Sequence, residues 1–141
     1  MDFVLDNSVA MRWLLESEKP SDQLYAESVL LTLSDTDALV PSLWHLEASN
    51  VLLSAEKRGE IHSGEVETFL SHLESLPIYV DAHTAQQAFN RTHALARAFK
   101  LSNYDAAYLE LALREGLPMA TLDKDLIKAA KKSNVPIYLK K

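Results

Sequence analysis

Short apolar runs alternate with longer amphipathic segments along the whole chain. An apolar run of three to five residues, bounded by polar residues or proline, suits a strand that is buried on both faces, as in a parallel sheet. Such runs predict five strands, at residues 3–5, 38–40, 78–80, 119–122 and 135–139. The last strand is expected at a sheet edge, because Pro136 has no N–H to donate to a neighbouring strand.

The segments between these runs carry apolar residues at the spacing of amphipathic helices. Small polar residues predict helix N-caps at Ser21, at Ser42 and at either Ser102 or Asn103, and Thr84 with Gln87 has the pattern of a capping box. Strands that alternate with helices in this way predict an α/β fold, with a central parallel sheet covered by helices on both faces. The helices are expected over residues 9–15, 21–33, 42–58, 63–76, 84–99, 102–116 and 124–132.

The composition indicates one domain over residues 1–141. The chain is 48% hydrophobic, and it has no internal repeat and no linker rich in Gly, Pro or Ser. It has no cysteine, which excludes disulfides, thiolate zinc sites and cysteine nucleophiles. No apolar stretch approaches the roughly 20 residues that cross a bilayer, and the N-terminus lacks the basic region of a secretory signal. We therefore expect a soluble cytoplasmic protein with no membrane partner.

The formal net charge of −6 argues against broad binding of a nucleic-acid backbone by the whole surface. Acids that cluster at one place, however, are candidate cation ligands, because a metal ion cancels their charge. Four acids occupy comparable places in the predicted alternation, close to the end of a strand or the start of a helix. If the strands are parallel, all of them lie at the same edge of the sheet. These acids are Asp6, Glu47, Asp105 and Asp123.

Each of the four acids also has a purely structural explanation. Asp6, Asp105 and Asp123 stand near helix starts, where a carboxylate caps backbone N–H groups or interacts favourably with the helix dipole. Glu47 could be an ordinary exposed helix residue, which is the usual state of glutamate. Taken singly, each acid leaves both interpretations open. Four coincidences at one sheet edge are much harder to explain than one shared site.

The neighbours of these acids favour a site for a hard cation. Thr121 and Asp123 are two residues apart on a predicted strand and therefore point to the same side. Asn50 lies three residues after Glu47 and shares its helix face, and Asp125 adds a further carboxylate. Ligand sets made only of oxygen select Mg²⁺ or Mn²⁺ rather than zinc.

Four segments of the chain, residues 4–8, 41–50, 101–108 and 120–126, together resemble the PIN-domain nucleases and, within them, the VapC-type toxins of toxin–antitoxin pairs. The resemblance implies a three-layer α/β/α fold and a Mg²⁺- or Mn²⁺-dependent endoribonuclease. The residues that match the catalytic and metal-binding acids of the family are Asp6, Glu47, Asp105 and Asp123, with Asp125 as a further candidate ligand. The residues expected to support these ligands are Asn7, Ser8, Asn50, Asn103 and Thr121.

The resemblance also implies a reaction and two protein partners. A metal-activated water would attack the phosphorus of RNA in line with the leaving 3′-oxygen, which gives 5′-phosphate and 3′-hydroxyl ends. A cognate antitoxin would lay an amphipathic segment along the early helices and place a basic side chain among the acids. A homodimer is expected as well. Its support in the sequence is the apolar bulk of the early helices, at Met11, Trp13, Leu14, Tyr25 and Leu30.

Other functions compete with this interpretation. A catalytically silent PIN scaffold that serves as an interaction module is the main alternative, and the presence of all four acids argues against it. A haloacid-dehalogenase-like phosphatase needs a second acid where this chain has Ser8, and a receiver domain would use Asp81 but needs paired acids after the first strand.

Lysines gather near the C-terminus. They form either a solvated polar face or a basic rim beside Asp123 that contacts RNA phosphates. These lysines are Lys124, Lys128, Lys131 and Lys132, and Lys100 ends an earlier helix that also carries two arginines.

Overall fold

The computed structural model describes residues 1–140, and a four-stranded parallel sheet lies at its centre. The strands are β1 (Phe3–Leu5), β2 (Ala38–Val40), β3 (Ile78–Val80) and β4 (Met119–Ala120). They lie side by side in the order β3-β2-β1-β4, and every neighbouring pair is parallel. The first three strands were predicted at these positions, whereas β4 ends two residues earlier than the apolar run suggests.

The central position of β1 explains why its sequence is apolar without alternation. All three of its residues are fully buried, because β2 and β4 pair with its two edges and helices cover its faces. Val4 is aligned with Leu39 on one side and with Met119 on the other. β1 is therefore held on all sides, and it determines where the residue after it lies.

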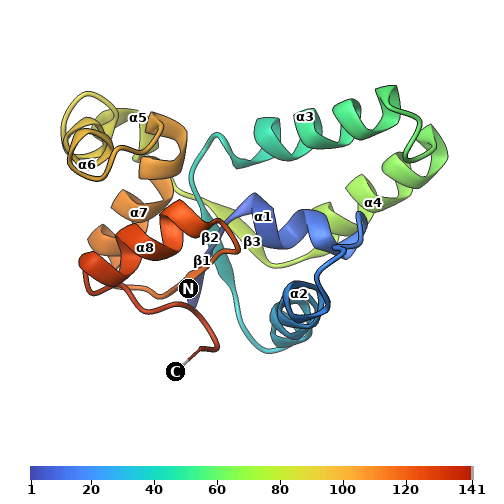
Figure 1. Ribbon diagram of the computed structural model, residues 1–141, viewed down its shortest axis with the longest axis horizontal. Coiled ribbons are helices and arrows are strands. Elements are labelled where there is room, and N and C mark those ends of the chain that lie inside the picture. The colour runs from blue at the N-terminus through green and yellow to red at the C-terminus, as the bar shows by residue number, and fades with distance from the viewer. Residues whose placement is uncertain (141) are drawn as a thin grey trace.

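The helices form a layer on each side of the sheet, as predicted. Figure 1 shows α5 to α8 on one side of the strands and α1 to α4 on the other, with α3 and α4 joined as a hairpin that extends away from the sheet. This is the three-layer α/β/α arrangement. The helices are α1 (Asn7–Ala10), which continues as the short 3₁₀ helix η1 (Met11–Trp13), then α2 (Pro20–Thr32), α3 (Trp44–Lys57), α4 (Ser63–Ser75), α5 (Thr84–Gln87), α6 (Arg91–Phe99), α7 (Asn103–Glu115) and α8 (Lys124–Lys132).

The predicted fifth strand at residues 135–139 is wrong as a regular strand. The segment does run along the free edge of β4, but only one bridge forms there, between Met119 and Ile137. Pro136 has no N–H to extend the ladder, and Leu139 has a left-handed backbone conformation with φ of 63° that ends the extended run.

Several predicted helix starts are also wrong. α2 begins at Pro20, one residue before Ser21, and the side chain of Ser42 does not cap α3, which begins at Trp44. The capping box at Thr84 does not form, because its hydroxyl donates to Asp81 Oδ2 at 3.0 Å and accepts from the N–H of Ser42 at 3.0 Å. The predicted cap at Ser102 is confirmed, since its hydroxyl accepts from the N–H of Asp105 at 3.1 Å.

The single helix predicted over residues 84–99 is broken into α5 and α6. Phe89 lies in this break and is 98% exposed to solvent. The apolar bulk of the early helices, by contrast, lies in the core. Met11 is 2% and Tyr25 8% exposed, and Trp13, Leu14 and Leu30 are partly buried against the same core. This bulk therefore gives no support for a dimer.

A buried ionic cluster fixes α7 against the end of β3. The Arg114 guanidinium donates to both oxygens of Asp81, at 3.0 and 2.7 Å, and to both oxygens of Glu110, at 2.9 and 3.0 Å. The Asp81 and Glu110 side chains are 5% and 2% exposed. Burial would raise the pKa of Asp81, but the hydrogen bonds from Arg114 and Thr84 outweigh it and lower that pKa below its usual 3.8. The cluster thus holds in place the helix that carries Asp105.

None of the helices over residues 1–140 has the length and apolar character needed to cross a membrane.

Replacing Arg114 with methionine should destabilise the protein by about 3–5 kcal/mol at neutral pH, because two buried carboxylates lose their partner. Folding lowers the pKa of Asp81, so its ionised carboxylate adds to the free energy of unfolding above the pKa that Asp81 has in the unfolded chain. This stabilisation is lost as pH falls through the pKa that Asp81 has in the folded protein. The difference in the free energy of unfolding between wild type and R114M should therefore become smaller below about pH 4. Urea unfolding at neutral pH and at about pH 3.5 measures this.

The exposed ion pair of Arg58 and Glu60 provides the matched control. Arg58→Met should change the unfolding midpoint little, because the charges of Arg58 and Glu60 are both already solvated. If the two arginine variants lost the same stability, the cluster would not fix α7 as described.

Candidate active site

The carboxyl ends of the four parallel strands meet at one edge of the sheet, and Asp6 follows the central one. The chain builds β2 and β3 on one side of β1 and then places β4 on the other side, so the strand order reverses between β1 and β4. Crevices at such reversals are the usual ligand sites of open α/β sheets. Here the N–H of Asp6 donates to the carbonyl of Ala120 at 3.0 Å, which brings the two strand ends together.

The Asp6 carboxylate is buried, at 6% exposure, and two hydroxyl groups hold it. Ser8 Oγ donates to Oδ2 at 2.6 Å, and Thr121 Oγ1 donates to the same oxygen at 2.8 Å. Burial nevertheless raises the pKa of Asp6 to about 6, because it outweighs these hydrogen bonds, and the charges of Asp105 and Glu47 raise it further. Both hydroxyls bind one oxygen, which leaves Oδ1 available to a cation.

The same hydroxyls shape the turn that follows β4. The N–H of Leu122 donates to Ser8 Oγ at 2.9 Å, and the N–H of Asp123 donates to Thr121 Oγ1 at 3.1 Å. Asp123 then caps α8, since its Oδ1 accepts from the N–H of Leu126 at 2.9 Å. Asp123 is therefore a helix cap, which is one of the two roles that its position suggested, and it lies two residues after Thr121 at the end of β4.

Glu47 reaches this edge from the first turn of α3, and it is half-buried. Tyr108 on α7 donates its hydroxyl to Glu47 Oε1 at 2.5 Å, and Asn7 Nδ2 lies 3.5 Å from the same oxygen. Asn7 is anchored in turn by donating to the carbonyl of Trp44 at 3.0 Å. Burial raises the pKa of Glu47 against these hydrogen bonds, and the charge of Asp105 adds to the effect.

Tyr108 is a site residue that the sequence analysis assigned only to a helix. It is fully buried, and burial together with the charges of Asp6 and Glu47 raises the pKa of its phenol, so it stays protonated and can donate. A signal for it existed: Tyr108 follows Asp105 by three residues, so both lie on one helix face. Glu47 is thus held by Asn7 and Tyr108, whereas Asn50, expected to support it, is exposed on α3.

Asp105 is the acid that links the others. The cap at Ser102 places it in the first turn of α7, where it is half-buried. Burial raises its pKa, and the charges of Asp123 and Asp125 raise it further. Since the charge of Asp105 also acts on Asp6 and Glu47, five carboxylates from four parts of the chain form one electrostatically coupled group.

The charges of these acids act on one another, but their side chains do not form a preformed metal site. Within residues 1–140, no three His, Cys, Asp or Glu side chains stand close enough together to grip a metal ion. Asp125 and Asn103, both expected at the site, are exposed in the first turns of α8 and α7. Repulsion among carboxylates keeps such groups apart, so side-chain rotation has to accompany binding.

The donor set suits a hard divalent cation. It consists of carboxylate and hydroxyl oxygens, and no arginine or lysine in the described part of the chain forms an ion pair with any of the four acids. The side-chain oxygen of Asn7 is also buried and has no hydrogen-bond partner within residues 1–140. A cation would supply the charge that this edge of the sheet lacks.

Comparison with known proteins agrees with the fold and covers the site. A model of the PIN domain family matches residues 3–132, a range that contains all four acids. The crystal structure of PAE2754 from Pyrobaculum aerophilum is similar, with a TM-score of 0.67 and 19% sequence identity, over 92% of this chain and 84% of that one. At this identity the likeness shows the fold alone. No curated protein matches the sequence.

Replacing Asp6 with asparagine should stabilise the metal-free protein above pH 6. The raised pKa of Asp6 means that the folded state holds a proton between about pH 4 and pH 6 that the unfolded chain releases, so wild-type stability falls as pH rises through this window. Asparagine keeps an oxygen for the two hydroxyls and has no charge to bury. We expect a gain of about 1–3 kcal/mol.

Thermal unfolding in EDTA measures the stability gained by D6N. The same measurement with MgCl₂ or MnCl₂ shows whether a cation stabilises the protein. Added cation should raise the unfolding temperature of the wild type and have much less effect on D6N. The control is Asp35→Asn, which makes the same chemical change at an exposed turn before β2, at the opposite edge of the sheet. A wild type that gains no stability from either cation would argue against a metal site here.

Proposed function

Because this chain belongs to the PIN domain family, whose members are generally metal-dependent nucleases, we propose that it is a Mg²⁺- or Mn²⁺-dependent endoribonuclease. The proposed ligands are Asp6, Glu47, Asp105 and Asp123, with Asp125 at the margin of the group. The observation that supports the proposal is that the four acids follow strand ends or lie at helix starts on one edge of the sheet, and that no arginine or lysine within residues 1–140 forms an ion pair with them.

In this mechanism hydrogen bonds hold two of the ligands, Asp6 and Glu47, and the protein supplies no nucleophile of its own. Ser8 and Thr121 fix Asp6, and Tyr108 and Asn7 fix Glu47. Mg²⁺ or Mn²⁺ would contribute positive charge next to the scissile phosphate and a lower pKa for the attacking water.

Hydrolysis then needs one further group to orient the water. Asp105 or Asp123 would accept a hydrogen bond from it, since both side chains are half-buried and can be reached from solvent. The water oxygen bonds to phosphorus as the bond to the 3′-oxygen breaks, and the leaving oxygen takes up a proton. The products would carry 5′-phosphate and 3′-hydroxyl ends.

Cleavage of RNA should depend on the cation and on the acids. The wild type should cut single-stranded RNA with Mg²⁺ or Mn²⁺ and not with EDTA, and Asp6→Asn or Asp105→Asn should lower the rate by at least about 100-fold. D35N should cut at the wild-type rate. Gel analysis with mapping of the new 5′ ends measures rate and chemistry together.

Unchanged cleavage by the Asp6 and Asp105 variants would exclude this mechanism. Absence of cleavage by the wild type, combined with retained binding of a partner protein, would instead favour the catalytically silent PIN scaffold.

The resemblance to VapC-type toxins extends the proposal to partners. We propose a cytoplasmic toxin that forms a homodimer and is inhibited by a cognate antitoxin. A surface cavity of about 610 Å³ lies between η1 and α4, and its apolar wall is formed by Trp13, Leu14 and Phe69. This cavity suits an amphipathic antitoxin segment. For a dimer, exposed leucines seven residues apart, Leu46 and Leu53 on α3, offer an apolar stripe in place of the residues buried in the core.

Adding the protein encoded by the neighbouring gene should stop RNA cleavage by this chain. A basic side chain placed among the acids would compete with the cation for their charge. Cleavage assays with increasing amounts of that partner test the inhibition, and light scattering on the same samples gives the mass of the toxin, expected for two chains. Undiminished cleavage at partner excess would contradict the antitoxin proposal.

A further inference from the structure

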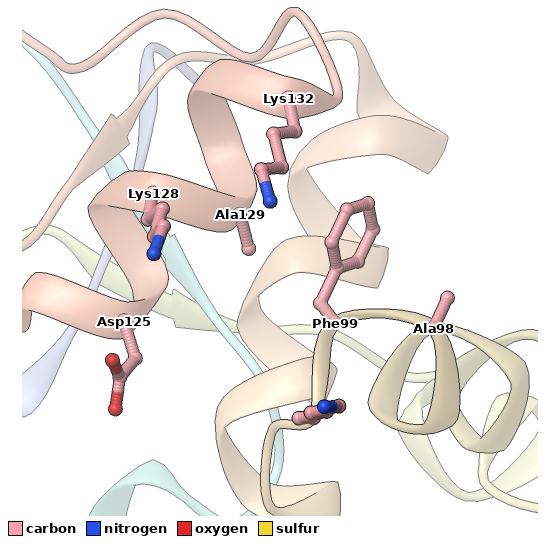
Figure 2. A pocket seen from close by; sticks show the side chains of 7 residues that line it. Ala98, Phe99, Asp125, Lys128, Ala129 and Lys132 are labelled. Carbon is pink, nitrogen blue, oxygen red and sulfur yellow. The ribbon is translucent and has the colours of Figure 1, made fainter.

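A pocket with a basic wall lies between the end of α6 and one face of α8. Its volume is about 390 Å³, and Phe99 and Lys100 line it from α6 while Lys128 and Lys132 line it from α8. Figure 2 shows Phe99 facing α8 across the pocket, with Lys128 and Lys132 on successive turns of that helix. We call this the lysine pocket.

The lysine pocket concentrates positive charge on an acidic protein. All three lysines are exposed, and within residues 1–140 none of them forms an ion pair. Asp125 is the one acid in the lining, and it lies at the end of the pocket nearest the start of α8. Against a net charge of −6, this local excess is a place where an anion would be attracted.

Lys100 occupies a backbone position that favours glycine. It ends α6 in the left-handed conformation, with φ of 56° and ψ of 42°, and its N–H bonds to the carbonyl of Ala96. The same chain ends α7 in the same conformation with Gly116, at φ of 65° and ψ of 38°. A lysine here is strained where glycine is not. A lysine at a backbone position that favours glycine indicates that the lysine side chain has a function.

The lysine pocket adjoins the acidic site along the chain at two places. Asp125 lines the pocket two residues after Asp123, and Lys100 stands five residues before Asp105. Asp123 caps the same helix that carries Lys128 and Lys132. A strand of RNA that places one phosphate at the acids therefore brings a neighbouring nucleotide to the pocket.

We propose that the lysine pocket binds one nucleotide of single-stranded RNA next to the scissile phosphate. Lys100, Lys128 and Lys132 contact phosphate oxygens, and the ring of Phe99 packs against the base. This subsite rests on the proposed function, because it uses the same substrate. The aromatic wall favours a nucleotide over an acidic peptide, since bases stack on aromatic rings whatever their identity.

Binding of a fluorescein-labelled oligouridylate of about 12 nucleotides in EDTA tests the subsite without cleavage. Replacing both Lys128 and Lys132 with glutamine should weaken binding about tenfold at low salt. It should also make the dependence of log K on log salt shallower by about 1.4, or about 0.7 for each lost phosphate contact. Fluorescence anisotropy at several salt concentrations measures both quantities.

The matched control is the double change of Lys131 and Lys140 to glutamine. These two lysines line a different pocket on another face of α8, so the control alters the net charge equally. It should leave affinity within about twofold of the wild type. Equal losses in the two double variants would mean attraction by net charge alone and would overturn the proposal, as would no loss in either.

Lys100→Gly separates binding from folding. Glycine relieves the left-handed conformation, so the unfolding temperature should rise or stay unchanged while RNA affinity falls about threefold. Unchanged affinity would remove Lys100 from the subsite. If an acidic peptide such as oligoglutamate bound this pocket and the RNA did not, the RNA subsite would be wrong.

Cleavage by the same variants distinguishes the two proposals. With Mn²⁺, the Lys128/Lys132 double variant should raise KM and leave kcat nearly unchanged, whereas loss of an acid lowers kcat. If the wild type bound RNA through these lysines but cut none, the nuclease proposal would fail and the subsite would stand. If it cut RNA and the lysine changes altered neither affinity nor KM, only the subsite would fail.

Discussion

The rest of this structure depends on one carboxylate buried at the end of the central strand. β1 has neighbours on both edges and helices on both faces, so Asp6 cannot move toward water without disturbing the sheet. The hydroxyls of Ser8 and Thr121 replace part of its lost hydration, but they bring no positive charge. The fold therefore keeps a costly negative charge at a fixed point. Such a charge is a liability in a structural position and an advantage in a cation site.

Two kinds of acid occur within a few turns of α7, and their surroundings separate them. Near its end, Glu110 joins Asp81 in accepting four hydrogen bonds from Arg114, so both buried carboxylates have a basic partner within the protein. Near its start, Asp105 faces other carboxylates, and no basic side chain of the described residues pairs with it. The first arrangement stabilises the helix and the second leaves charge to be neutralised from outside. Pairing thus distinguishes structural acids from candidate ligands.

The sequence was sufficient for the features that depend on pattern over several residues. Three of the four strands and the sheet edge shared by the acids follow from apolar runs and from parallel pairing. It failed where a single contact decides: Thr84 bonds to Asp81 across a loop instead of capping its helix, and Phe89 is exposed by a break that periodicity does not reveal. Tyr108 was missed as a site residue because its partner, Glu47, is 61 positions away. Contacts of this kind depend on how α3 and α7 are placed, which no local pattern specifies.

Under the proposed function, the charge layout gives the cation a role beyond chemistry. Unneutralised, the coupled carboxylates would repel an RNA phosphate from the very edge where it has to be cut, and the negative surface as a whole would add to this repulsion. In the proposed subsite, the lysine pocket would attract the neighbouring part of the strand. A cation bound by the acids would make this edge of the sheet attractive to a phosphate. The acids with their cation and the lysine pocket would then both bind the same RNA strand. Under the proposed function, substrate binding and catalysis are therefore coupled through one ion, and an RNA-binding surface can exist on an acidic protein.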